Sequence, residues 1–533
     1  MRGSSLIPWR SAPGRVAGLV LIMAAVCALL LAVPGQSATA KYVNDLFIFL
    51  DGAHRVVSGQ VPNRDFHTVL GPLVYYIPAI GLLISGSLGA AMPIGMALLI
   101  AVVAPAFAYV FASRLTPGVA LPFAAFLLLI LAVPMNLGEG FVSLSFGMFY
   151  NRVGWVLLAI LLVMYLPPRH AMRWRTALDG ACAALLVVLL AYMKASYGAV
   201  ALAYLGFLLV VSRDRAWPAL ALAIAAAVAL IVELFWRSSF AYVGDLLLAD
   251  KVSGGLHGGL DTPEISFLRN LADYVIAAGF AGLALWRRRS LRDLLFYGFC
   301  ALAGFLLIRQ NFQMSGIVTL FAAAAVATEL VARDVETSVP GTRRWPGRGA
   351  ELVLLAVLLP TIAHCAIALG LHVAAASARP VATFALPKFD RIRLVDFGTH
   401  WDFNFFTLYG RTLEDGARAL ATLGPAPGPV FVLDFVNPFT AGLGLAPPRG
   451  DSPWHHFERT FDKRTFVPAA ALLADVRVVM EPKVSVEEGT SQALRQVYAP
   501  YLAENFELAQ ETDFWRVFRA KRPQGVASAA TER

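Results

Sequence analysis

Residues 16–33 read VAGLVLIMAAVCALLLAV, and this uninterrupted apolar stretch indicates the class of the fold. A helix of that length crosses the hydrocarbon layer of a bilayer, which is ~30 Å thick. Recurrent runs of this kind are typical of membrane spans rather than of a buried soluble core. The sequence therefore predicts an all-α polytopic membrane domain. The other apolar runs cover residues 71–88, 91–112, 118–134, 153–166, 177–193, 195–212, 217–235, 269–285, 293–309, 313–332 and 350–372.

The composition agrees with a membrane protein. Hydrophobic residues make up 58% of the 533 residues and charged residues only 15%, whereas about a quarter of a soluble domain is charged. The net charge of +9 arises largely in short arginine-rich clusters between the runs, and such clusters mark cytoplasmic loops. No basic domain with interleaved aromatic residues accompanies them, which argues against a nucleic-acid partner. The clusters lie at residues 169–175, 213–215, 287–292 and 343–348.

The first apolar run determines the sidedness of the chain. Basic residues precede it at Arg2, Arg10 and Arg15. Because a positive flank stays in the cytoplasm, the residues from Lys41 onward are predicted to lie outside it. Residues 38–40 (Ala-Thr-Ala) resemble a signal-peptidase site. The run is long for a signal peptide, however, and this favours a retained first span.

Counting the spans exposes a mismatch. With residues 41–70 outside, four crossings would bring the arginine cluster 169–175 outside as well, against the charge rule. We therefore expect one further short span within Leu137–Tyr150, surrounded by protein rather than lipid. That gives about thirteen transmembrane helices and places Arg237–Arg269 and His372–Arg533 outside the cytoplasm.

The chain changes character near residue 376. Apolar runs there shorten to strand length, and a Gly/Pro turn precedes the first of them. The alternation predicts a small α/β periplasmic domain over residues 376–533, beside a membrane domain over 1–375 whose outer loop is 37–70. No glycine-rich phosphate loop follows the first two strands. The predicted elements are strands Val430–Phe435 and Val476–Met480, a helix Ser491–Ala499 ended by Pro500, and strands Phe506–Ala509 and Trp515–Arg519.

Charge gathers in the first outer loop, Asn44–Tyr76 (NDLFIFLDGAHRVVSGQVPNRDFHTVLGPLVYY). Ionisable groups beside a bilayer are costly and are kept mainly for function or for helix capping. Apolar residues recur at helical spacing from Leu46 to Val57, which predicts an amphipathic helix lying in the membrane interface. Asp45 then stands at the N-terminus of this helix, where a lipid headgroup would arrive.

Each acid of the loop also has a purely structural interpretation. Asp45 would serve as a helix N-cap, a common use of aspartate. Asp51 stands four residues before Arg55, which is the spacing of a surface ion pair on a helix. Asp65 follows a Pro-Asn-Arg sequence and would form a turn. Spacing alone leaves the structural and the catalytic interpretations open.

Together these residues resemble the first outer loop of bacterial C-type membrane glycosyltransferases, the relatives of protein O-mannosyltransferases and of lipid A aminoarabinose transferase. Many members have Asp-Glu, then a helix with Ala-x-Arg-Val, Gly-x-x-Pro and Arg-Asp-Phe. Here Leu46 replaces the Glu, so the loop lacks a paired carboxylate. The order of first span, outer loop, multi-span body and outer C-terminal domain is similar too. The matching residues are Asp45, Ala53-His54-Arg55-Val56, Gly59, Pro62, Arg64-Asp65-Phe66, Gly71-Pro72 and Tyr75-Tyr76.

The resemblance implies an inverting enzyme that transfers a hexose or pentose from a polyprenyl-phosphate carrier. A loop carboxylate, Asp45 with Asp65 as the second candidate, would accept the proton of the acceptor hydroxyl. Cations would hold the leaving phosphate. Lys194, Arg309 and Arg152 stand near predicted outer span ends, although such residues are also common interface anchors. The loop residues Arg55, Arg64 and Tyr75 complete the predicted substrate-binding set.

No cofactor is predicted from the sequence. Some enzymes of the resembling group use a divalent ion and others do not, and the missing second carboxylate argues against one here. The adjacent His455 and His456 do not share a helix face, so a surface loop is favoured over a metal site. The cysteines lie in apolar runs without the spacing of a zinc site or a disulfide framework: Cys27, Cys182, Cys300 and Cys365.

Two other classes of function stay open. A transporter or lipid flippase predicts inverted repeats and broken helices with charges at mid-membrane, whereas the charges here cluster at outer span ends. A non-enzymatic scaffold would not need the loop aspartate. The long loop Arg237–Arg269 would act as a substrate lid or as a solvated connection. The expected partners are membrane lipids, a lipid-linked sugar donor and a lipid, glycan or protein acceptor, in a bacterial inner membrane.

Overall fold

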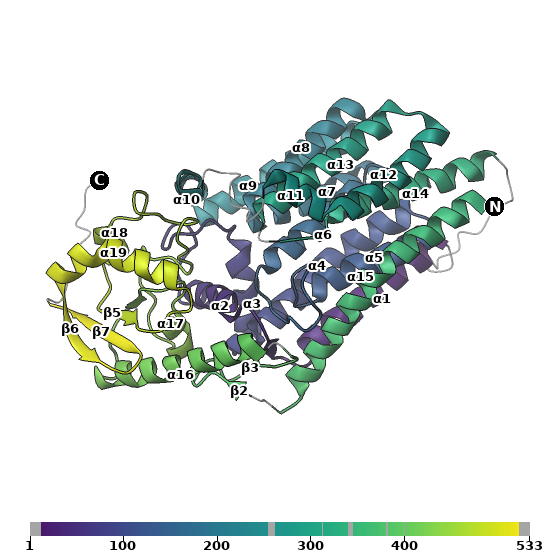
Figure 1. Cartoon of the computed structure of the whole chain (residues 1–533). Coiled ribbons are helices and arrows are strands. Elements are labelled where there is room, and N and C mark those ends of the chain that lie inside the picture. Colours follow the sequence, from purple (N-terminus) through teal and green to yellow (C-terminus); the bar gives the residue numbers. More distant parts are fainter. Residues whose placement is uncertain are drawn as a thin grey trace.

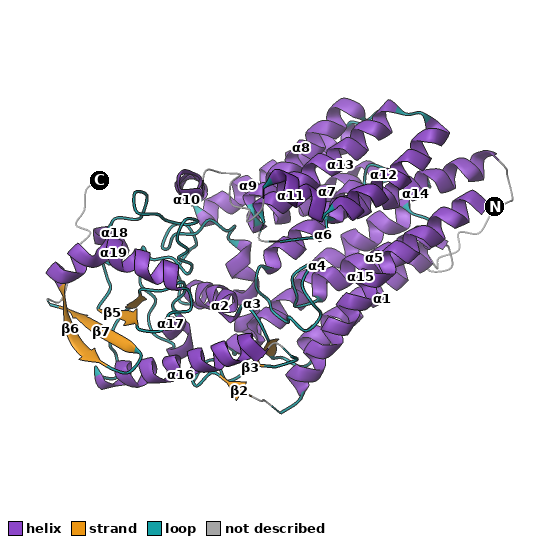
Figure 2. Ribbon diagram, in the orientation of Figure 1, coloured by secondary structure: helices purple, strands orange, loops and turns teal. Residues whose placement is uncertain are grey.

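The structure is a computed structural model and describes residues 12–253, 262–311, 313–338, 345–379, 382–398 and 400–521. The molecule is elongated, with a bundle of long helices at one end and a smaller part containing strands at the other (Figure 1, Figure 2). Each apolar run of the sequence corresponds to one helix. These helices are α1 (Ala12–Ala32), α3 (Leu73–Ser85), α4 (Leu88–Arg114), α5 (Pro117–Ala132), α6 (Phe149–Val163), α7 (Arg175–Met193), α8 (Ala195–Val211), α9 (Ala216–Trp236), α12 (Leu271–Arg288), α13 (Leu291–Gln310), α14 (Val318–Ser338) and α15 (Trp345–Ser377).

The helices of the bundle differ in length. Within the described ranges, six are long and apolar enough to cross a membrane. A seventh is added if α11 (Pro263–Arg269) and α12, which are bent by 65° relative to each other, form one span. The apolar helices α3, α5, α6 and α8 are shorter. The protein is therefore a multi-pass membrane protein, and the expected number of about thirteen spans is not confirmed.

The additional span predicted within Leu137–Tyr150 is wrong. Residues 133–148 form a loop between α5 and α6. Gly138 has a left-handed backbone (φ 87°), which an α-helix cannot contain. The loop folds back onto the segment that follows α1, where the Ala40 N–H donates to the Leu144 carbonyl over 2.8 Å. Glycines and these backbone contacts outweigh the apolar character that suggested a helix.

The mismatch in span counting is resolved by α3. Just before α3, the Gly71 N–H donates to the Met193 carbonyl at the end of α7 over 3.1 Å. Just after α3, the Gly89 carbonyl accepts a hydrogen bond from Ser37 Oγ over 2.7 Å. Both contacts lie at the end of the bundle that faces the strands, so α3 returns to the side from which it started (Figure 1). The arginine cluster 169–175 then falls at the opposite end without an extra span.

A small sheet connects the two ends of the sequence. β1 (Ser37–Thr39), which follows α1, pairs in parallel with β3 (Ile392–Leu394). β2 (Ala382–Thr383) pairs with β3 in the antiparallel sense. The side chains of Ser37 and Thr39 are fully buried. The C-terminal part is therefore attached to the N-terminal helix by a backbone ladder that the sequence did not predict.

A second sheet has the strand order β4-β5-β7-β6. β4 (Val430–Val432) is parallel to β5 (Val478–Pro482), and β5 and β6 (Phe506–Glu511) are both antiparallel to β7 (Trp515–Ala520). Each of these strands overlaps a strand predicted from the sequence. The predicted α/β character of the tail is thus confirmed for the residues that the structure describes.

The helices of the C-terminal part were predicted less well. Residues 400–422 were not predicted to be helical, yet they form a long helix. The predicted helix end before Pro500 is also wrong, because Pro500 lies inside a helix whose Leu494 and Tyr498 are packed in the core. That packing outweighs the loss of one backbone hydrogen bond at the proline. The helices are α16 (His400–Thr422), α17 (Pro438–Leu443), α18 (Ala469–Leu472) and α19 (Glu488–Asn505).

Helix α2 (Val43–Val57) lies between the bundle and the C-terminal part (Figure 1). The helix itself is confirmed, and protein packs against both of its faces. Phe47 stacks on Phe389 of the C-terminal part, with ring centroids 4.7 Å apart. Phe49 contacts Phe149 of α6 edge to face at 5.0 Å. α2 is therefore a core element that joins the two parts.

Candidate active site

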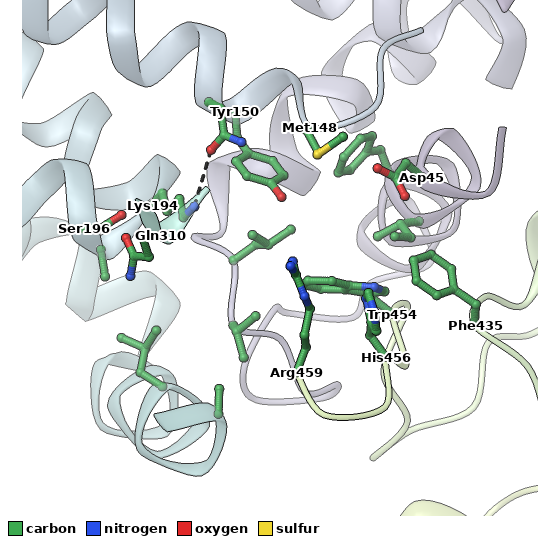
Figure 3. Close-up of a pocket in the computed structure, with 18 of the residues that line it drawn as sticks. Asp45, Met148, Tyr150, Lys194, Ser196, Gln310, Phe435, Trp454, His456 and Arg459 are labelled. Carbon is green, nitrogen blue, oxygen red and sulfur yellow. Dashed lines mark hydrogen bonds between the residues drawn. The ribbon is translucent and has the colours of Figure 1, made fainter. Parts of the chain in front are cut away.

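A cavity of about 380 Å³ lies where α2, α6, the junction of α7 and α8, α10 (Ser239–Ser253) and the C-terminal part meet (Figure 3). Its walls combine charged groups with aromatic rings. Segments that are far apart in the sequence supply them, from the first outer loop to the loop between β4 and β5. The lining includes Asp45, Tyr150, Lys194, Phe435, Trp454, His456 and Arg459.

Asp45 stands in the first turn of α2, and its carboxylate faces the cavity. It accepts no hydrogen bond from the part of the chain that the structure describes. Protein surrounds it on its other sides, and this burial raises the pKa of Asp45 to about 7, although the positive charge of Arg459 acts in the opposite direction. A carboxylate that is available and has a pKa near neutrality is suited to accept a proton.

A glycine allows the neighbouring loop to approach Asp45 closely. A Cβ atom on Gly147 would lie 3.2 Å from the Asp45 Cβ and 3.1 Å from the Tyr42 Cβ. Those distances are too short for ordinary contact between side chains. Gly147 therefore lets the loop before α6 form the wall directly behind Asp45.

Lys194 lies between α7 and α8 on the other side of the cavity (Figure 3). Its Nζ donates to Asn151 Oδ1 over 3.3 Å and to Asn311 Oδ1. It also lies 5.3 Å from the centroid of the Tyr150 ring. Among the described residues, no carboxylate forms an ion pair with Lys194. Burial and, to a smaller extent, the charge of Arg459 lower the pKa of Lys194 to about 7.

The C-terminal part contributes an aromatic wall and an arginine. The rings of Phe435, Trp454 and His456 contact one another, with centroids 5.3 to 6.3 Å apart. Arg459 follows in a tight turn, and its guanidinium points into the cavity between Lys194 and Asp45 (Figure 3). Sequence analysis missed these residues. The only signal was the aromatic- and histidine-rich composition of WHHFER at residues 454–459.

Of the six non-glycine residues with left-handed backbones in the described part of the chain, three lie in or next to the cavity lining. Tyr42 and Met148, which both line it, have left-handed backbones with φ of 52° and 53°. Glu458, which precedes Arg459, has φ of 62°. A left-handed backbone at a non-glycine residue costs ~1–3 kcal/mol and is found preferentially at functional sites. This distribution agrees with a functional role for the cavity.

Two of the predicted loop residues form a turn outside the cavity lining. Asp65 Oδ2 accepts a hydrogen bond from the Val61 N–H over 2.8 Å. This contact agrees with the structural interpretation of Asp65 as a turn former. Asp65 also lies 3.2 Å from Arg64 and 3.5 Å from Arg449. Arg64 is half exposed. Of the two candidate bases, Asp45 alone belongs to the cavity that contains Lys194.

Arg55 and Tyr75 are buried inside the protein. Arg55 Nε bonds to Asp51 and Nη2 to Asp451, each over 2.7 Å, and all three side chains are essentially inaccessible to solvent. The prediction of a surface pair between Asp51 and Arg55 is therefore right about the partners and wrong about the exposure. The Tyr75 hydroxyl forms a hydrogen bond with Thr68 Oγ1 over 2.7 Å. These contacts give both predicted substrate-binding residues structural roles.

The remaining predicted cations, Arg152 and Arg309, do not line the cavity. Arg152 is buried in α6 and donates from Nη1 to the Met135 carbonyl over 2.9 Å. Arg309 lies over the Phe305 ring at 5.9 Å, in the last turn of α13. Its neighbour Gln310 lines the cavity. Among the described residues, Lys194 is thus the one predicted cation that lines the same cavity as Asp45.

The long segment Arg237–Arg269 is not a simple loop. It contains α10 and α11, and residues 254–261 lie outside the described residues. Leu246, Ala249 and Asp250 of α10 form one wall of the cavity. Asp245 bonds to His67 Nδ1 over 2.7 Å and thereby attaches α10 to the first outer loop.

The two adjacent histidines are not on a surface loop as predicted. His455 is buried and bonds through Nε2 to Asp451 over 3.0 Å, whereas His456 lines the cavity. Within the described residues, no group of three or more His, Cys, Asp or Glu side chains is arranged to hold a metal ion. The cavity lining supplies three carboxylates, two cations and several amide and aromatic groups; the carboxylates belong to Asp45, Asp250 and Glu487.

No protein-family model matches the chain, and no curated protein sequence matches it. Among solved structures, the crystal structure of ArnT from Cupriavidus metallidurans in the apo state is similar, with 15% identity over 94% of this chain and 97% of that chain and a TM-score of 0.46. The cryo-EM structure of the arabinofuranosyltransferase AftD from Mycobacteria is similar over 95% of this chain and 40% of that one, with 16% identity and a TM-score of 0.40.

Both solved structures are C-type membrane glycosyltransferases, the group that the first outer loop resembles. Since both TM-scores lie below 0.5, we draw nothing about the function of this chain from the similarity.

Proposed function

We propose that the protein is a membrane glycosyltransferase that transfers a sugar from a polyprenyl-phosphate donor to a hydroxyl group of a cell-envelope acceptor. One observation supports this above all: Asp45 and Lys194 stand on different walls of the same cavity. The carboxylate is available to accept a proton, and the hydrogen bonds that the ammonium group donates to the described residues end on amide oxygens. A reaction that removes a proton at one point and releases an anion at another needs these two groups.

In the proposed step, the acceptor hydroxyl transfers its proton to the Asp45 carboxylate. The acceptor oxygen forms a bond to the anomeric carbon of the donor sugar while the bond from that carbon to the phosphate oxygen breaks. The electron pair of the broken bond stays on the polyprenyl phosphate, next to the positive charge of Lys194. Attack from the face opposite the phosphate inverts the anomeric centre.

The surface around the cavity is suited to a lipid-linked donor. α10 lines the cavity with Leu246 and Ala249. Other side chains of the same helix are apolar and exposed, including Phe240 (93% exposed), Val243 and Leu247. Exposed apolar side chains of this density mark contact with lipid or with another protein. A prenyl chain beside α10 would leave its phosphate at the mouth of the cavity.

We propose that Asp45, Lys194 and the segment 376–533 face the periplasm across a bacterial inner membrane. The arginine cluster 169–175 supports this side, because it lies at the opposite end of the bundle from the cavity and such clusters stay in the cytoplasm. The transferase domain of the proposal comprises residues 1–375. The sugar is a hexose or a pentose, and the acceptor is a lipid, a polysaccharide or a protein.

A transporter explains the cavity less well. The break between α11 and α12 resembles the broken helices of transporters. Two polar groups at this break have protein partners: Asn270 Nδ2 donates to the Met314 carbonyl over 3.2 Å, and Asp273 accepts from the Ile317 N–H over 3.0 Å. The charged groups Asp45, Lys194 and Arg459 lie in the cavity and not at this break.

A strain that lacks the protein provides the test. Wild-type protein and Asp65→Asn should restore the missing envelope glycan, whereas Asp45→Asn should reduce its formation by about 10²-fold or more, the usual contribution of a general base. Glycan profiling by mass spectrometry measures the result, and immunoblots of membranes show that the variants insert in equal amounts. Full restoration by Asp45→Asn would refute the assignment of the base, and the opposite pattern would transfer it to Asp65.

A further inference from the structure

We propose that Arg459 is the second phosphate-binding cation of the cavity, so that the phosphoryl group of a ligand lies between Lys194 and Arg459 and the C-terminal part completes the site. The identity of that ligand as the sugar donor rests on the proposed function. The presence of an anion-binding site does not, because it is inferred from the two cations of the lining, Lys194 and Arg459.

The first argument is the environment of Lys194. Its partners in the described structure are the amide oxygens of Asn151 and Asn311. The Asn311 amide is itself held by the Tyr197 hydroxyl over 2.9 Å. An ammonium group that is withdrawn from water is costly unless a negative charge compensates it. Two neutral amides orient Lys194 without neutralising it, and among the described residues no carboxylate forms an ion pair with it, so a phosphoryl group beside Lys194 would compensate its charge.

The second argument is the direction of the Arg459 side chain. It enters the cavity from the C-terminal part and points between Lys194 and Asp45 (Figure 3). The charge of Arg459 affects the pKa of both Asp45 and Lys194. A guanidinium presents a planar fork of donors that matches two phosphate oxygens, and a nearby ammonium supplies a point charge.

The third argument is that the turn carrying Arg459 is rigid. The His456 carbonyl accepts the N–H groups of Arg459 and Thr460 over 3.1 and 2.9 Å. The His456 N–H donates back to Thr460 Oγ1 over 2.8 Å. Glu458 donates to the Phe461 carbonyl over 2.8 Å and has the left-handed backbone that closes the turn. An arginine held in this way is pre-organised for a ligand.

The turn is also attached to the helix that carries the proposed base. Arg55 of α2 bonds to Asp451 and to the Pro448 carbonyl, each over 2.7 Å. His54 bonds to the Leu445 carbonyl over 2.8 Å. These buried contacts fix the loop before Arg459 relative to α2. Asp45 and Arg459 therefore keep a constant spacing although 413 residues (459 minus 45, less one) separate them in the chain.

Binding measurements on the purified full-length protein in nanodiscs test the proposal. The probes are a polyprenyl phosphate without sugar, the corresponding neutral polyprenol and inorganic phosphate. Quenching of tryptophan fluorescence reports binding, since Trp454 lies in the wall beside Arg459. Arg459→Ala should weaken binding of the polyprenyl phosphate by about 10- to 100-fold, the usual effect of losing hydrogen bonds to a charged group. Arg459→Lys should retain part of the affinity.

The matched control is Arg464→Ala, which removes an exposed arginine of the same loop and should leave binding unchanged. Polyprenol should bind equally to wild type and Arg459→Ala, because it has no phosphate. Equal affinity of wild type and Arg459→Ala for the polyprenyl phosphate would overturn the proposal. An equal loss for polyprenol would also overturn it, since the variant would then have changed the shape of the cavity.

Inorganic phosphate separates the two sources of the anion. Competition by millimolar phosphate that disappears in Arg459→Ala supports a site for the phosphoryl group itself, whether or not a lipid carries it. Competition that persists in that variant counts against the proposal. Asp45→Asn should bind the polyprenyl phosphate like wild type. Loss of sugar transfer in Asp45→Asn together with unchanged binding in Arg459→Ala would leave the proposed function intact and remove this inference alone.

Discussion

Asp45 and Lys194 have opposite ionisation requirements but pKa values in the same range. Burial raises the pKa of Asp45 to about 7 and lowers the pKa of Lys194 to about 7. Asp45 must be deprotonated to accept a proton, so kcat/KM should rise as the pH increases through about 7. Lys194 must be protonated to hold a phosphate, so kcat/KM should fall above the same region. We expect a narrow bell-shaped profile with its maximum near pH 7.

The profile is measured as kcat/KM for sugar transfer in proteoliposomes between about pH 5.5 and 8.5. Lys194→Arg should move the falling limb to higher pH, because a guanidinium stays charged over this range. The rising limb should stay in place, since Asp45 is unchanged. A falling limb that does not move in Lys194→Arg would show that another group controls it.

At the scale of single residues, two of the three charged residues of the proposed site, Asp45 and Lys194, were predicted from the sequence. Asp45 and Lys194 were accessible to prediction because each stands next to an apolar run, where a charge needs a reason. Arg459 stands in the C-terminal tail, and nothing local distinguishes it from Arg464. The second carboxylate partner of Arg55, Asp451, was not predicted, because it is 396 residues away in the chain. Long-range partners of this kind are not encoded in spacing along a helix.

At the scale of elements, α2 depends on a buried charge network. Arg55 bonds to Asp51 and Asp451, and Asp451 Oδ1 also accepts from His455 over 3.0 Å. Burial alone would raise the pKa of Asp451, but the Arg55 charge and the His455 hydrogen bond outweigh it and lower that pKa. The pKa of Asp51 is raised, because burial outweighs the same arginine there. Arg55 thus compensates two buried acids that belong to different parts of the molecule.

Removing that arginine should destabilise the protein strongly. Arg55→Ala leaves two carboxylates buried without their shared cation, which should cost ~3–5 kcal/mol of unfolding free energy. Arg64→Ala is the matched control from the same loop. Its ion pair with Asp65 is half exposed and should contribute less than ~1 kcal/mol. Thermal denaturation in detergent, followed by intrinsic fluorescence, measures both variants. Equal melting temperatures would show that the network contributes nothing to the attachment of α2.

For the molecule as a whole, the apolar runs predicted the helices well and their topology less well. Each run became a helix because a bilayer leaves the backbone no other means of satisfying its hydrogen bonds. Whether a helix crosses the membrane depends on where its two ends are attached. The segments on either side of α3 are attached through Gly71 and Gly89 to residues far away in the chain. The pairing of β1 with β3 escaped prediction for the same reason. Three residues after the first span carry no recognisable strand pattern.

Cysteine labelling in intact cells distinguishes this topology from the one with thirteen spans. Single cysteines at Ser87, Arg464 and Arg173 are introduced into a variant whose own cysteines are replaced by alanine. Ser87 follows α3, Arg464 is exposed in the C-terminal part, and Arg173 is exposed in the arginine cluster. If α3 returns to the end from which it started, a small membrane-impermeant thiol reagent should modify Ser87→Cys and Arg464→Cys. Arg173→Cys should react only after permeabilisation, because that cluster lies at the opposite end of the bundle. If Ser87→Cys, like Arg173→Cys, reacts only after permeabilisation, α3 crosses the membrane.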